Sequence, residues 1–104
     1  MKELKLQVEK LADEELKRSM VKFPLFNSTH EGWAVLKEEV EESADEMLYV
    51  EGNIKCVWVQ LKKNNQENAI EYIKELKESA TNLAAEAIQV VAMASKFLES
   101  FKDE

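Results

Sequence analysis

Residues 69–101 read AIEYIKELKESATNLAAEAIQVVAMASKFLESF, and this stretch decides the fold class. Apolar side chains recur in it at steps of three and four residues over more than four heptads, which is the period of one helix face. The pattern predicts one long helix, or two nearly collinear helices with a break at residues 79–82, where Ser, Thr and Asn lower helix propensity. The positions on this face are Ala69, Ile73, Leu76, Ala80, Leu83, Ala87, Val91, Ala94, Leu98 and Phe101.

The N-terminal part of the chain shows the same period. A first helix is expected from about Lys2 to Val21, and it has to stop there because Pro24 disfavours helix at the residue before it. Ser28 and Glu31 have the spacing of a capping box, which predicts that the next helix begins at this point.

The middle of the chain predicts two more segments. The helix that begins at Ser28 should run to about Tyr49. An apolar stripe over residues 50–61 should form a third helical piece, which either bends away from the second helix near Gly52 or continues it with a kink. Asn64 and Glu67 are spaced as the cap of the last helix. We therefore expect an all-α fold, an antiparallel bundle of about four helices with a long C-terminal helix, in a single domain over residues 1–104.

Composition limits the function classes. The formal charge of −7 and the absence of a Lys/Arg cluster argue against nucleic-acid binding, whereas carboxylates suit divalent cations. Cys56 is the only cysteine, which is typical of a reducing compartment. No apolar run resembles a signal peptide or a membrane span, so a cytoplasmic protein is expected. The long apolar seam predicts a homo-oligomer, a dimer or a tetramer.

Carboxylates crowd the second predicted helix, with six in residues 38–46. Glu39, Glu42 and Glu46 form a stripe along one flank, from which they could face a neighbouring helix and share a cation. Glu86 and Gln89 stand three residues apart in the apolar part of the last helix. Burying a carboxylate without a partner is costly, so Glu86 either reaches water at the helix edge or takes part in a site.

These two acidic segments resemble those of the MazG-like, all-α nucleotide pyrophosphohydrolases. That family carries an E-E-x-x-E segment on one helix and an E-x-x-D segment on another, matched here by residues 38–42 and 86–89. Residues 26–33 and 89–94 are similar to small phage-type and Gram-positive-type members. The resemblance covers roughly residues 28–101. It implies magnesium-dependent hydrolysis of a nucleotide to its monophosphate and pyrophosphate.

Carried over by position, the resemblance makes Glu39, Glu42 and Glu86 metal ligands, with Glu39 and Glu42 also acting in catalysis. Gln89 stands where the family has an aspartate, and an amide is a weaker ligand for a hard cation. Glu46 is the candidate to replace the missing acid. The two acidic segments are also further apart than is usual in the family.

Two residues near the acids could contact a substrate. Lys37 could contact phosphate and Trp33 could stack on a base, although a tryptophan at helical spacing is more often a core residue. His30 is better explained as part of the helix start.

Two other interpretations of the sequence stay open. The chain could be a non-catalytic helical-bundle scaffold of phage or bacterial origin, which the amide at Gln89 favours. It could also be a coiled-coil-type protein in which every carboxylate is solvated surface.

Overall fold

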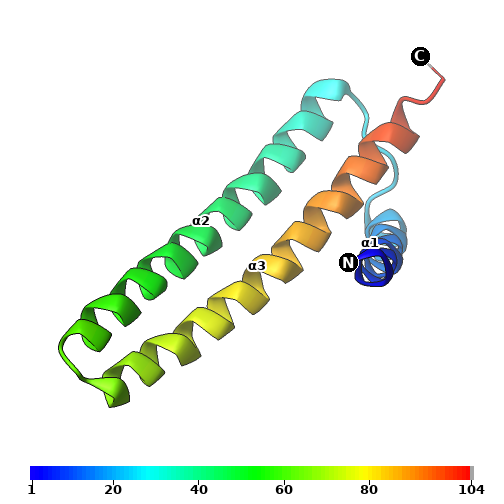
Figure 1. Cartoon of the computed structure of the whole chain (residues 1–104). Coiled ribbons are helices and arrows are strands. Elements are labelled where there is room, and N and C mark those ends of the chain that lie inside the picture. Colours follow the sequence, from blue (N-terminus) through cyan, green and yellow to red (C-terminus); the bar gives the residue numbers. More distant parts are fainter. Residues whose placement is uncertain (104) are drawn as a thin grey trace. The chain divides into compact units, whose positions relative to one another are not determined.

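The computed structural model describes residues 1–103, and within them the chain is all-α. Three helices follow one another: α1 (Lys2–Lys22), α2 (Thr29–Lys62) and α3 (Gln66–Ser100) (Figure 1). The all-α prediction is confirmed, but the expected number of four helices is wrong. None of the helices over residues 1–103 is long and apolar enough to cross a membrane.

The expected fourth helix is absent because the interruption at Gly52 is too weak to end α2. Helix α2 continues through Gly52 and Asn53, and α3 continues through residues 79–82. A glycine inside a helix costs only about 1 kcal/mol, which flanking apolar contacts offset. Within α3, the Thr81 hydroxyl donates to the carbonyl oxygen of Lys77 at 2.8 Å, a bond that helices accommodate.

The helix ends follow the local chemistry. Helix α1 stops at Phe23, whose backbone is extended (φ −133°, ψ 108°) as expected before Pro24. The Ser28 hydroxyl accepts a bond from the Glu31 N–H at 3.1 Å, so the predicted cap of α2 is confirmed. The predicted cap of α3 is wrong by one residue: the Asn65 side chain, rather than that of Asn64, accepts the bond from the Asn68 N–H at 3.1 Å.

Asn64 has another role, since its φ of 57° is left-handed and turns the chain after α2. The connection to α3 therefore takes only residues 63–65. A loop this short requires the following helix to run antiparallel to α2.

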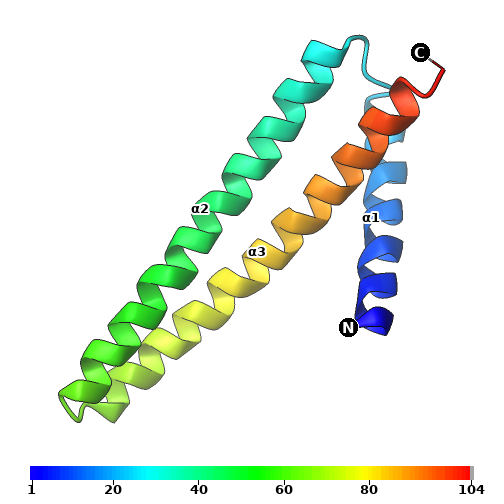
Figure 2. The ribbon, with the colours of Figure 1, turned by 45° about the horizontal axis from the view of Figure 1, so that its top comes forward.

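The contacts divide the chain into two compact units. The first unit comprises Met1–Glu41 with the chain from Glu86 onward, and the second unit is Glu42–Ala85. In the first unit, α1 lies beside the C-terminal part of α3 (Figure 2). Its core is formed by Ala12, Phe26, Ala92 and Met93, with Leu16, Val35, Leu36, Ile88, Phe97 and Phe101 packed around them.

The loop between α1 and α2 is fixed to α3 within the first unit. The Phe26 N–H donates to the Ser100 hydroxyl at 3.0 Å, and that hydroxyl donates to the carbonyl oxygen of Lys96 at 2.7 Å. Phe26 is buried, whereas Phe23 and Leu25 are exposed, so only one residue of this apolar segment enters the core.

The second unit is a hairpin of two antiparallel helical segments, which lie side by side (Figures 1 and 2). Its described core is small: Val57 of α2 and Ala69 of α3 are its buried apolar residues. Two helices alone cannot cover both of their apolar faces.

Candidate metal centre

Two of the predicted ligands meet in the first unit. Glu39 on α2 and Glu86 on α3 are 47 residues apart in sequence, yet one carboxylate oxygen of each lies within 4.8 Å of the other. Both side chains are half-buried. The two oxygens are close enough for one cation to bind both, and neither residue is without an interaction partner in the chain.

Glu42 is the third predicted ligand, and it lies on α2 as Glu39 does. It follows Glu39 by three residues on α2, so it lies on the same helix face one turn further on. Glu42 is exposed and is the first residue of the second unit. Three carboxylates are the hard oxygen donors that magnesium and calcium prefer, and water completes the coordination shell of magnesium.

Glu46 lies one further turn along α2, in the second unit, and is half-buried. Its part as a replacement ligand stays a prediction.

Gln89 is engaged by the first helix. Its amide nitrogen donates a hydrogen bond to Glu15 on α1 at 2.8 Å, in a partly buried position. The same glutamate also pairs with Arg18. The amide therefore links α3 to α1 by a hydrogen bond. An aspartate at position 89 could not make this bond, because its carboxylate would face the carboxylate of Glu15.

Glu15 was missed in the sequence, although a signal was present. It is half-buried and lies three residues after Ala12 on the face of α1 that enters the core. A carboxylate on an otherwise apolar face needs a partner, and the partner is the amide of Gln89.

Lys96 was also missed, although it is the most deeply buried charged residue described, with only 3% of its surface exposed. Its ammonium donates to the Ser19 hydroxyl at 2.8 Å and to the Phe23 carbonyl oxygen at 2.7 Å, and it lies 5.0 Å from the centre of the Phe26 ring. Desolvation lowers the pKa of Lys96 below 10.5, and the charge of Glu31 partly opposes this shift. The lysine lines a cavity of about 270 Å³.

The predicted substrate contacts lie elsewhere on α2. The Lys37 ammonium pairs with Glu41 at 2.6 Å and lies 5.7 Å from the centre of the Trp33 ring, which is 61% exposed. At 100° per residue, Lys37 points about 200° away from Glu39 around the helix. Lys37 therefore points away from Glu39, and contact of Lys37 or Trp33 with a substrate stays a prediction.

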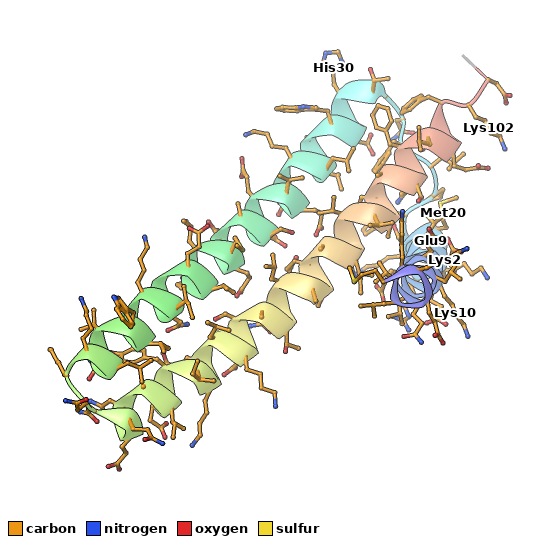
Figure 3. All side chains as sticks on the ribbon, viewed as in Figure 1. Lys2, Glu9, Lys10, Met20, His30 and Lys102 are labelled. Carbon is orange, nitrogen blue, oxygen red and sulfur yellow. The ribbon has the colours of Figure 1, made fainter. Side chains whose placement is uncertain are left out.

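His30 is at the N-terminal end of α2 and points outward from it (Figure 3). With Thr29, Trp33 and Phe97 it borders a shallow hollow of about 310 Å³ in the first unit. This position agrees with its interpretation as part of the helix start.

In comparisons with known proteins, no family model, curated protein or solved structure matches the chain. Groups of carboxylates also occur on exposed helix faces that bind no ion. The functional argument therefore rests on the placement of the two acidic segments.

Proposed function

We propose that this chain is a MazG-like nucleoside triphosphate pyrophosphohydrolase that uses Glu39, Glu42 and Glu86 to hold magnesium. The observation that supports the proposal most is the approach of Glu39 and Glu86 to within 4.8 Å. These two residues come from the two separate acidic segments on which the resemblance to that family depends. A random surface distribution of acids gives no reason for the two segments to meet.

The three carboxylates match the chemistry of the ion. Magnesium binds carboxylate oxygens and keeps several waters, so a half-buried pair with an exposed third carboxylate suits it. When bound, magnesium supplies charge neutralisation for the triphosphate oxygens and for the departing pyrophosphate. A protein of charge −7 needs this neutralisation before a nucleotide can approach.

The residues of the chain then have distinct tasks. Glu39, Glu42 and Glu86 hold the cation, with ligands from two different helices. Glu42, which is exposed, orients the attacking water and accepts its proton as the bond between the α-phosphate and pyrophosphate breaks. The products are a nucleoside monophosphate and pyrophosphate.

The test is magnesium-dependent release of pyrophosphate from a panel of nucleoside triphosphates. Glu39→Gln should lose this release, because an amide cannot replace the charge of the ligand. Glu38→Gln is the matched control: it is the neighbouring exposed glutamate and should keep full activity. Equal turnover in the Glu39→Gln variant and the wild type would refute the assignment of the site.

The Gln89–Glu15 hydrogen bond favours a second candidate, a non-catalytic helical scaffold that has kept the bundle without the fourth acid. The exchange of Glu15→Gln with Gln89→Glu keeps the hydrogen bond and moves the carboxylate to α3. If the wild type releases no pyrophosphate and binds no magnesium, while this double variant gains magnesium binding, the scaffold is the better description.

A further inference from the structure

The cavity that Lys96 lines lies wholly within the first unit. It is bordered by residues of α1, of the loop that follows α1, of α2 and of α3. Its volume of about 270 Å³ is close to the lower limit of about 300 Å³ for small-molecule sites in proteins. A ligand of this cavity is therefore a small molecule.

Most of the cavity wall is apolar. Phe26 and Met93 are buried and Val35 is half-buried, whereas Phe23 and Pro24 are exposed. The wall therefore leads from the core of the unit to its surface, and the exposed residues form the rim. Water is disfavoured against such a wall, so the cavity suits a ligand with an aliphatic body.

Lys96 places a positive charge in the buried part of this wall. Its ammonium donates to the Ser19 hydroxyl and to the Phe23 carbonyl oxygen, and it lies over the Phe26 ring. These three neighbours are all uncharged. An ammonium has three N–H donors, of which the two acceptors use two. Because a buried charge is stabilised by a partner of opposite sign, a ligand carboxylate suits this position.

Glu31 lines the same cavity from its exposed side. It is close enough to Lys96 for its charge to raise the pKa of the lysine, against the larger lowering by desolvation. The cap of α2 uses the backbone N–H of Glu31, which donates to the Ser28 hydroxyl. The cavity thus combines a cation in its interior with an anion at its rim.

The two charges select between classes of small ligand. A simple carboxylic acid would pair with Lys96 but would also face the negative charge of Glu31. A simple amine would pair with Glu31 and would face the positive charge of Lys96. A zwitterion satisfies both residues, whereas a nucleotide carries no amine for Glu31.

We propose that this cavity binds a free apolar α-amino acid of about the size of leucine. The carboxylate of the amino acid accepts a hydrogen bond from Lys96, and its ammonium group donates to Glu31. The aliphatic side chain packs against Phe26, Val35 and Met93. Binding pairs both charges and displaces water from the apolar wall.

Isothermal titration calorimetry of the whole chain tests the proposal with three probes that share one carbon skeleton. They are L-leucine, L-leucinamide, which has no carboxylate, and 4-methylpentanoate, which has no amine. Leucine should bind with a dissociation constant of about 1 mM or lower, and each of the other two should bind about tenfold more weakly or worse.

Two single variants assign the two charges. Lys96→Met should bind leucine and leucinamide about equally, because the partner of the carboxylate is gone. Glu31→Gln, at an exposed position, should bind leucine and 4-methylpentanoate about equally. Lys102→Met is the matched control: it removes an exposed lysine outside the cavity lining and should bind all three probes as the wild type does. Circular dichroism should show the same helix content in all variants.

The proposal is overturned if leucine does not bind at about 10 mM, or if the wild type binds the three probes equally. It is also overturned if Glu31→Gln keeps the full preference for leucine over 4-methylpentanoate. The outcome is independent of the proposed hydrolysis, because Glu39→Gln should lose pyrophosphate release and still bind leucine as the wild type does.

Discussion

Substituting Gly32 with alanine should destabilise the protein, although alanine normally stabilises a helix. Gly32 is buried in α2, and a Cβ atom there would lie 2.5 Å from Phe97 Cδ2 and 3.0 Å from Phe26 Cδ2. Carbon atoms in contact are normally about 3.5–4.0 Å apart, so the Phe97 ring would have to retreat by about 1 Å. Overpacking of this kind costs about 1–3 kcal/mol, against a gain of about 1 kcal/mol from helix propensity.

The net effect of Gly32→Ala is therefore a loss of about 0–2 kcal/mol in the free energy of unfolding. Gly52→Ala is the matched control in the same helix: no atom lies within 4 Å of its Cβ position, so this variant should gain about 0.5–1 kcal/mol. Urea unfolding followed by circular dichroism, at one protein concentration, measures both changes. Equal stabilisation by the two substitutions would refute the close packing of Gly32 against the two rings.

Two further predictions concern the first unit. Ser28→Ala removes the acceptor of the Glu31 N–H and should cost about 1 kcal/mol in urea unfolding, whereas Ser28→Asp keeps the cap and should not. Because the pKa of Lys96 is lowered in the folded state, the folded protein holds fewer protons than the unfolded chain at pH values between that pKa and 10.5. The free-energy cost of burying the Lys96 charge therefore falls as pH rises through this window. The stability of Lys96→Met relative to the wild type should therefore fall as pH rises toward 10.5, and a pH-independent difference would contradict the buried charge.

The fold class was predictable because the helical period of residues 69–101 is long and regular. The number of helices was not, because the prediction ended a helix near Gly52, whereas for residues 79–82 it left open both one long helix and a break. Composition lowers helix propensity at both places, but packing over neighbouring turns decides whether a helix continues. The start of α2 was predictable because Ser28 acts through local hydrogen bonding, which depends only on nearby residues.

The candidate site was predictable in part. The approach of Glu39 and Glu86 agrees with the stripe read from the sequence. The hydrogen bond from Gln89 to Glu15 and the burial of Lys96 could not be predicted from the sequence, because both depend on how α1 packs against α3. Helical periodicity shows which face of α1 is buried, but it does not show which residue of another helix that face meets.

Thermal unfolding with increasing magnesium, for the wild type and for the single variants Glu39→Gln, Glu86→Gln and Glu38→Gln, tests the metal site most directly. A ligand that binds only the folded state raises the melting temperature in proportion to the logarithm of its concentration once the site is saturated. The wild type and Glu38→Gln should show this rise, and the other two variants should lose it. Melting temperatures that do not respond to magnesium in any of the four proteins, or that respond equally in all, would contradict a metal site at Glu39 and Glu86.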